Sequence, residues 1–338
     1  MVHPSSLELC GRLYAAGGAR SRQVTMRSVL VGSDLGPRSE AVVRGAAALA
    51  LGSGATLHVV HALGWIGMPL REALTALHAG ADHRARQALG EQVGRVLGKG
   101  SDSAVAGVEY ASPPLAILER ARDLGPDAVV LGATDPPGAG GYLSGTTLRV
   151  AAAASQPVLV LREPFSWPPR SVLCPVEEPD GCDDGLRRAC EWLHRACPAP
   201  SSRGGRDPSM ELLVVDVADR LSASPDRAAA LARAARRVCG RNLRVTGIQD
   251  PRHGRSPAAP AEQVLDWAGR NGVDLVLLHR RGDDSTPLQD RTWYQVLLRA
   301  PCPVCLLPEV AEAATPPAAA AGERARAPED DVVLAVGS

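Results

Sequence analysis

Residues 27–34, Arg-Ser-Val-Leu-Val-Gly-Ser-Asp, join a short apolar strand to a polar turn, and the first four of them recur 143 residues later. The second occurrence, residues 170–173, also opens a short apolar run. A closing segment recurs as well, because Pro-Val-Leu-Val-Leu at residues 157–161 resembles Pro-Val-Cys-Leu-Leu at residues 303–307. Self-similarity at one spacing indicates two copies of one structural unit.

Each copy is predicted to alternate strands with helices. In the first copy we expect strands near residues 29–33, 56–61, 105–110, 127–131 and 157–161. In the second we expect them near residues 171–177, 211–217, 243–248, 273–279 and 303–307. Helical patterns lie between these strands, and such alternation is typical of parallel sheets with helices on both faces. The predicted fold class is therefore α/β, with two tandem open five-stranded parallel sheets.

The chain has 338 residues, enough for two domains of ordinary size. We expect a disordered leader (1–26), a first domain (27–162), a linker (163–169), a second domain (170–308) and a disordered tail (309–338). Met26 directly precedes the first strand and is a testable alternative start. Phe165 and Trp167 stand in a linker stiffened by three prolines, so we expect the two domains to stay in contact.

Composition narrows the classes of partner. Lys plus Arg equal Asp plus Glu at 37 each, so no net charge recruits nucleic acid or an anionic membrane, and neither is expected as a partner. The sequence has no apolar run long enough to span a membrane and no secretory signal pattern, so we expect a cytoplasmic protein.

Seven of the eight cysteines lie in the second copy and are expected to be free thiols. Cys302 and Cys305 match a CxxC spacing, but a strand there sends them to opposite faces, which disfavours metal or redox use.

The candidate site lies where strand order reverses in the first copy. Open parallel sheets bind ligands there, beyond the carboxyl ends of their strands. Two loops meet at this point, a Gly-Ser-Asp turn after strand one and a Gly-rich loop over residues 132–147 after strand four. Glycines, hydroxyls and a helix N-terminus are suited to holding phosphate. The candidate binding residues are Gly32, Ser33, Asp34, Val60, Gly132, Ala133, Thr134, Gly145, Thr146 and Thr147.

These motifs resemble a known family. Two copies of a strand ending in Val-x-x-Asp, a GxxGx9G[S/T]-type loop and a Pro-Val-Leu-Val strand look like a tandem universal stress protein over residues 27–162 and 170–308. The resemblance implies strand order 3-2-1-4-5, pairing of domains through their fifth strands, and ATP with Mg²⁺ as the ligand of an intact loop. It places Asp34 beside the nucleoside, Gly132 and Gly145 at the first and last loop glycines, and Thr146 as the hydroxyl that follows.

Two departures from the family pattern bear on ligand binding. In the first copy the middle loop glycine is replaced by Asp135, whose carboxylate would repel a polyphosphate unless a cation bridges them. In the second copy, Glu177 stands for Asp34, and His279 or Leu278 for Gly132, while residues 291–293, Arg-Thr-Trp, replace Gly-Thr-Thr. The second copy is then either a structural partner or an anion site built from Arg280, Arg281 and Arg291; the nearby Asp283, Asp284 and Asp290 favour the structural partner.

The preferred hypothesis is a regulatory protein that binds ATP in the first domain, with the second domain as a structural partner in a pseudo-dimer. The alternative is a nucleotide-free scaffold for stress responses that acts through protein contacts. No catalyst is expected, although slow ATP hydrolysis stays open, since the sequence offers no general base and no metal-held water. A homodimer and a further protein partner are also left open. Neither copy carries the loop motifs of ATP pyrophosphatases or adenylyltransferases.

Overall fold

A computed structural model describes residues 25–64, 71–98, 103–133, 143–162, 165–176, 184–198, 210–217, 229, 232–233, 235–236, 244–248, 260–280 and 287–308. The predicted leader, apart from its last two residues, and the predicted tail lie outside these ranges. Met26 belongs to the core rather than to a disordered leader: its side chain is buried, and its backbone N–H donates to the carbonyl oxygen of Arg195 at 3.4 Å. The prediction that the ordered chain starts at residue 27 is therefore wrong by at least one residue.

The first unit consists of β1 to β5 with helices α2 to α5. Its elements are β1 (Ser28–Ser33), α2 (Pro37–Ser53), β2 (Thr56–Ala62), α3 (Arg71–Leu97), β3 (Ala104–Glu109), α4 (Pro113–Leu124), β4 (Ala128–Gly132), α5 (Gly145–Ala153) and β5 (Val158–Leu161). The helix ends follow local chemistry. Pro37 occupies the first turn of α2, and the helix ends at Gly54, whose φ of 73° is favourable for glycine.

The second unit consists of β6 to β10 with their helices. Its elements are β6 (Ser171–Val176), α6 (Asp184–Ala196), β7 (Glu211–Asp216), β8 (Arg244–Ile248), α8 (Pro260–Asn271), β9 (Leu275–His279), the 3-10 helix η4 (Leu288–Asp290), α9 (Thr292–Arg299) and β10 (Val304–Leu307). All ten predicted strands are present within a few residues of their predicted bounds. The predicted solvated loop over residues 197–210 lies almost entirely outside the described residues.

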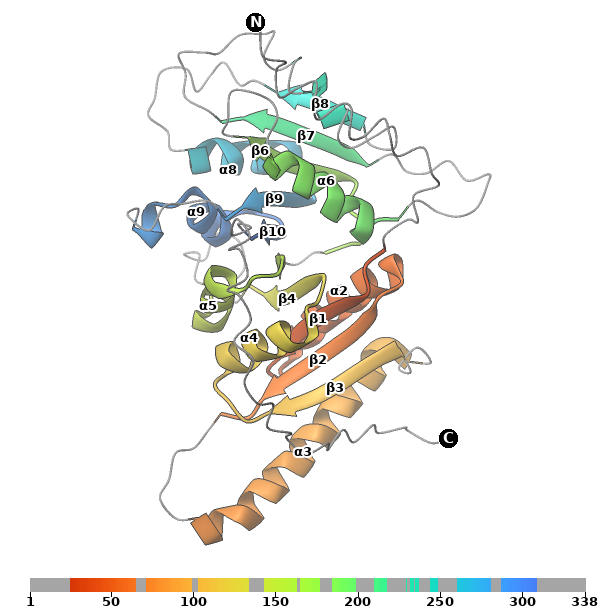
Figure 1. Cartoon of the computed structure of the whole chain (residues 1–338), viewed down its shortest axis with the longest axis vertical. Coiled ribbons are helices and arrows are strands. Elements are labelled where there is room, and N and C mark those ends of the chain that lie inside the picture. Colours follow the sequence, from red (N-terminus) through yellow and green to blue (C-terminus); the bar gives the residue numbers. More distant parts are fainter. Residues whose placement is uncertain are drawn as a thin grey trace, which may run out of the picture.

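The two units share one ten-stranded sheet of order β3-β2-β1-β4-β5-β10-β9-β6-β7-β8 (Figure 1). Each unit contributes five parallel strands in the order 3-2-1-4-5, as predicted. The prediction of two sheets needs one correction, because β5 and β10 pair antiparallel, with Leu159 opposite Cys305. An edge strand has unpaired backbone groups on one side, and this pairing satisfies them for both units.

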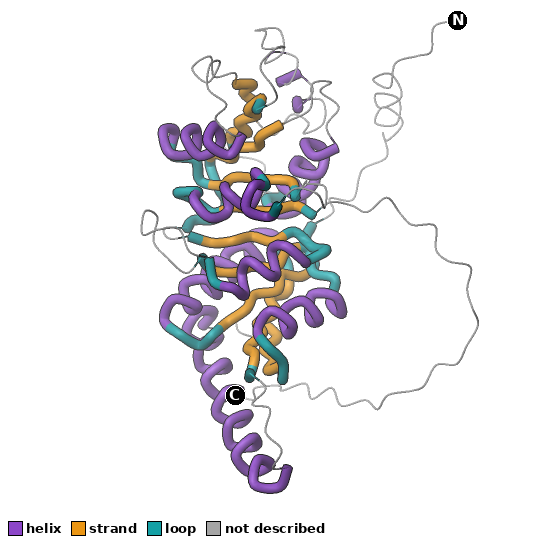
Figure 2. Tube along the Cα trace, turned by 90° about the vertical axis from the view of Figure 1, so that its left-hand side faces the viewer, coloured by secondary structure: helices purple, strands orange, loops and turns teal. Residues whose placement is uncertain are grey.

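Helices cover both faces of the shared sheet (Figure 2). One core layer contains buried residues of α2, α3 and α6 and the sheet residues that face them, and it runs through both units. The other contains buried residues of α4, α5, α8 and α9 with the opposite face of the sheet. Cys302 belongs to the second layer and Cys305 to the first, which confirms that the CxxC thiols face opposite ways.

The linker aromatics join the two units. The Phe165 and Trp167 ring centroids lie 6.0 Å apart, and the Trp167 ring meets the Trp192 ring of α6 edge-on at 6.1 Å. On the other side, Trp167 lies close enough to Gly52 of α2 that a Cβ there would be 3.1 Å from its ring. The predicted role of Phe165 and Trp167 in holding the units together is confirmed by these contacts.

Candidate functional site

A pocket of about 560 Å³ opens in the first unit at the carboxyl ends of β1 and β4, where strand order reverses. This is the position at which open α/β sheets bind ligands, and the volume suits a small molecule. Its walls come from β1, β2, β4, β5, α2, α4 and the start of α5. The lining residues are Gly32, Ser33, Asp34, Arg38, Ser39, Ala41, Val42, Val60, His61, Ala62, Pro113, Ile117, Leu131, Gly132, Ala133, Ser144, Thr146, Thr147, Leu161, Arg162 and Phe165.

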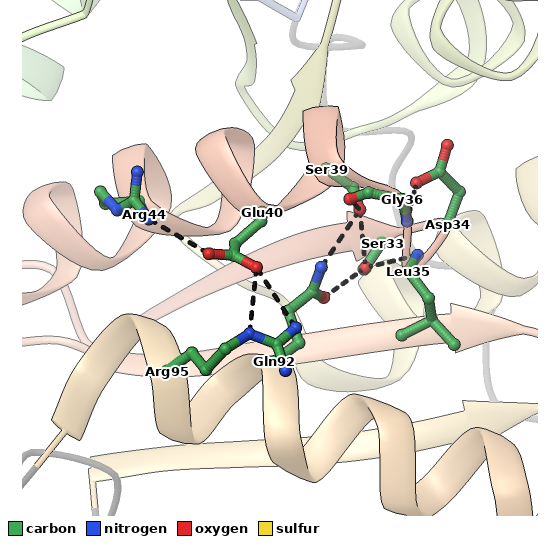
Figure 3. A network of polar contacts seen from close by, with 9 residues as sticks. All are labelled: Ser33, Asp34, Leu35, Gly36, Ser39, Glu40, Arg44, Gln92 and Arg95. Atoms are coloured by element: carbon green, nitrogen blue, oxygen red, sulfur yellow. Dashed lines mark hydrogen bonds and ion pairs between the residues drawn. The ribbon is translucent and has the colours of Figure 1, made fainter.

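The turn after β1 is fixed by its own side chains. The Oγ of Ser33 accepts a hydrogen bond from the N–H of Leu35 at 3.0 Å, and Oδ1 of Asp34 accepts one from the N–H of Gly36 at 2.8 Å. Leu35 has a φ of 65°, a left-handed conformation that side chains rarely adopt, so these bonds hold a turn that the backbone alone disfavours. Figure 3 shows the Asp34 carboxylate extending from this turn, away from α3.

A buried glutamine from α3 supports the same turn from below (Figure 3). Gln92 is 1% exposed; its Oε1 accepts from Oγ of Ser33 at 2.6 Å, and its Nε2 donates to Oγ of Ser39 at 3.3 Å. Beside it, the carboxylate of Glu40 lies 3.2 Å from both Arg44 and Arg95. These contacts connect the start of α2, which forms the first wall of the pocket, to α3.

The opposite wall is the N-terminus of α5. Ser144 caps the helix, accepting from the N–H of Thr147 at 3.0 Å. The hydroxyl of Thr147 in turn donates to the carbonyl oxygen of Gly132 at 2.9 Å. The end of β4 is thereby joined to the helix that follows the Gly-rich loop, and the free amides of the first helical turn are placed beside the pocket.

An added Cβ would make a close contact at two lining positions. A Cβ at Gly132 would lie 2.7 Å from Cγ2 of Val42, and one at Gly32 would lie 2.8 Å from Cδ1 of Ile117. Distances below 3.0 Å are not tolerated without movement of a neighbour. Any side chain at Gly132 would therefore narrow the pocket where β4 meets α2.

Eight of the ten predicted binding residues line this one pocket: Gly32, Ser33, Asp34, Val60, Gly132, Ala133, Thr146 and Thr147. Gly145 is the first residue of α5 and does not line the pocket, although its neighbours Ser144 and Thr146 do. Thr134 and Asp135 lie outside the described residues.

The sequence did not single out several lining residues. Ser144 precedes a Gly-Thr-Thr helix start, a capping pattern that was available in the sequence. His61, whose Nδ1 lies 2.8 Å from the carbonyl oxygen of Ser33, is adjacent to Val60, a predicted residue. Arg162 follows β5, and only the three-dimensional structure brings it to the pocket, since it is 128 residues from Asp34 in the sequence.

In the second unit, the matching positions are filled by side chains. In the second unit His279 pairs with Leu307, the last residue of β10. In the first unit Gly132 pairs with Leu161, the last residue of β5. His279 rather than Leu278 therefore corresponds to Gly132. Trp293, aligned with Thr147, is 2% exposed and belongs to the core. Glu177, Arg281, Asp283 and Asp284 lie outside the described residues.

Arg280 and the cysteines bear on two further predictions for the second unit. Arg280 donates to the carbonyl oxygens of Ala151 and Ala154 at the end of α5, at 3.2 and 2.7 Å. This contact to the first unit favours a structural role over an anion site. Cys190 is disulfide-bonded, so the prediction that the seven cysteines of the second copy are free thiols is wrong for it, whereas Cys174, Cys197, Cys302 and Cys305 form no disulfide.

Among the residues that the structure describes, no group of three or more His, Cys, Asp and Glu side chains could hold a metal ion. Likewise, none of the helices in this part of the chain is both long and apolar enough to span a membrane.

The first unit is similar to known proteins. Residues 25–162 match the model of the universal stress protein family. A universal stress protein from Archaeoglobus fulgidus DSM 4304 superposes with a TM-score of 0.56 at 12% identity, covering 82% of this chain and 97% of that chain, and thus shares the fold. Another similar structure is UspA from Lactobacillus plantarum, with 21% identity and a TM-score of 0.36, covering 41% of this chain and 99% of that chain. A universal stress protein from Archaeoglobus fulgidus in complex with dAMP has 22% identity and a TM-score of 0.31, covering 41% of this chain and 99% of that chain. Comparison with curated proteins gives no match. The match to the universal stress protein family model thus covers the first unit, residues 25–162, which is less than half of the chain.

Proposed function

We propose that the first unit binds ATP in this pocket and that the second unit, a degenerate domain of the same kind, serves as its structural partner. The observation that carries the proposal is that one pocket gathers residues from two loops about 100 residues apart, at the reversal point of strand order. The loops are the Ser33–Asp34 turn and the Gly132–Thr147 segment.

The chemistry of the lining suits the two ends of a nucleotide. Val42, Val60, Ile117 and Leu131 offer an apolar wall for a base. The N-terminus of α5 with Thr146 and the bare backbone at Gly132 suits phosphate groups. Mg²⁺ accompanies ATP as the counter-ion of its phosphates. The bound nucleotide then acts as a conformational signal.

The test uses a matched pair of substitutions at Gly145, where an added Cβ meets no atom within 4 Å. Purified protein is denatured and released nucleotide is chromatographed, and ATP affinity is then measured by calorimetry. We expect Gly145→Ala to bind as the parent does. Gly145→Asp should lose affinity, because a carboxylate at the start of α5 repels phosphate.

A parent protein that releases no nucleotide and shows no heat with millimolar ATP would refute the proposal. The alternative, a nucleotide-free scaffold that acts through protein contacts, would then be preferred. For the second unit alone, the buried side chain of Trp293 already favours a role without nucleotide.

A further inference from the structure

Arg162 is a buried cation at the junction between the pocket and the second unit. It directly follows β5, is 7% exposed and lines the pocket. Its Nη2 donates to the carbonyl oxygens of Leu297 and Leu298, at 2.7 and 3.0 Å, in the last turn of α9. One side chain therefore belongs to the pocket wall of the first unit and contacts a helix of the second.

This contact has a counterpart in the opposite direction. Arg280 of the second unit donates to the last carbonyls of α5 in the first unit, as described above. Helix C-termini carry a partial negative charge and unpaired carbonyls, so each arginine stabilises the end of a helix in the other unit. The two differ in surroundings, because only Arg162 lines the pocket.

The charge of Arg162 is incompletely compensated. Within the described ranges no carboxylate lies within ion-pair distance of its guanidinium, and its Nε is buried without a hydrogen-bond partner. Burial lowers the pKa of Arg162, which expresses the cost of keeping this charge away from water. The partial charge of a helix end offsets only part of that cost. An anion in the adjoining pocket would supply the missing compensation.

Of the other charged groups that line the pocket, Arg38 lies at the start of α2 and adds a second positive charge. Asp34 is the opposing carboxylate, and its Oδ1 already accepts from the N–H of Gly36. Among the described lining residues, cations therefore outnumber carboxylates two to one.

We propose that Arg162 contacts the anionic part of the nucleotide in this pocket, and that α9 of the second unit holds its guanidinium in place for that contact. The inference rests on the proposed function and deepens it, since the second unit then contributes to the site in the first. A guanidinium anchored at one nitrogen keeps donors for a phosphate oxygen.

The test compares ATP with adenosine, which lacks the anion, in the full-length chain. Affinities for both are measured by calorimetry for the parent, Arg162→Gln and Arg280→Gln. The matched control, Arg280→Gln, also removes an arginine from a helix end across the units but leaves the pocket lining intact. For Arg162→Gln we expect ATP affinity to fall by about tenfold or more with adenosine affinity unchanged. For Arg280→Gln both should stay within about twofold.

Hydrogen exchange gives a second readout. ATP should slow amide exchange in residues 292–299 of α9 in the parent but not in Arg162→Gln. If Arg162→Gln does not fold, as judged by circular dichroism, Arg162→Lys is used, for which we expect a smaller loss of ATP affinity and unchanged adenosine affinity.

The outcomes separate the two proposals. Suppose that the parent binds ATP, but the Arg162 variant loses affinity equally for ATP and adenosine, or loses no more ATP affinity than Arg280→Gln does. Either result would overturn this inference and leave the proposed function intact. No ATP binding in the parent would overturn both.

Discussion

The two units follow one strand order but differ at the carboxyl ends of their strands. In the first, Gly132 and Thr147 leave an open pocket, whereas His279 and Trp293 take the corresponding places in the second. The apolar strands that build the shared sheet have been kept in both units. A ligand site depends on a few positions where a small residue is required, and the fold does not depend on them.

The difference between the two units is tested most severely at Trp293, which we interpret as a core residue in the place of a pocket residue. Replacing it with its first-unit counterpart, Trp293→Thr, should destabilise the protein by about 3–5 kcal/mol, because a buried aromatic ring is lost and a cavity is left. Urea unfolding measures the effect. Tyr294→Thr is the matched control, since Tyr294 is only half-buried, and a loss as large as that of Trp293→Thr would contradict the interpretation.

The reverse exchange, Gly132→His, should close the pocket of the first unit. The new Cβ would lie 2.7 Å from Cγ2 of Val42, so we expect a stability loss of about 1–3 kcal/mol together with loss of measurable ATP binding. Calorimetry and thermal unfolding test this. In Gly107→Ala, at a β3 position where a Cβ meets nothing within 4 Å, binding should be retained. Undiminished ATP affinity in Gly132→His would place the ligand elsewhere.

A smaller difference concerns two equivalent aspartates. Asp127 accepts from the N–H of Arg27 at 2.6 Å, and Asp274 accepts from that of Arg170 at 2.7 Å. Asp127 also pairs with Arg195 of α6 at 2.9 Å, across the units. Asp127→Ala should therefore cost about 1 kcal/mol more than Asp274→Ala in urea unfolding. Equal costs would show that the pair with Arg195 contributes nothing.

A pH-dependent effect is expected in the alkaline range, where buried thiols of the second unit titrate. Burial raises the pKa of Cys302 to about 12, whereas an unfolded thiol titrates near 9. The unfolded chain therefore releases this proton first, so the free energy of unfolding should fall between about pH 9 and 12, by at most about 1.4 kcal/mol per pH unit for one thiol. Cys302→Ala should make the profile less steep, while the buried thiols of Cys197 and Cys305, whose pKa values are also raised by burial, keep part of the dependence. An unchanged profile in that variant would exclude Cys302 as the source.

Periodicity was enough to predict the strands, since Val29 to Val31 and Val304 to Leu307 are apolar runs whose burial the sheet requires. The pocket residues near Asp34 and Gly132 were predictable because each follows a strand directly. Arg162 also directly follows a strand, but its contact with α9 was not predictable, because that contact depends on the pairing of β5 with β10. Gln92 was missed for a similar reason: a polar residue on a long helix is typically exposed, and only its contacts with Ser33 and Ser39 account for its burial.

The pairing of β5 with β10 has a further physical consequence. The strands belong to one chain, and their two units are joined by a connection of only nine residues, 162–170, between β5 and β6, with Phe165 and Trp167 held between the units. Their association is therefore intramolecular, governed by an effective concentration that dilution does not change. Two separate domains joined by the same strands would dissociate at low concentration, whereas this sheet should stay intact at any concentration at which the chain is folded.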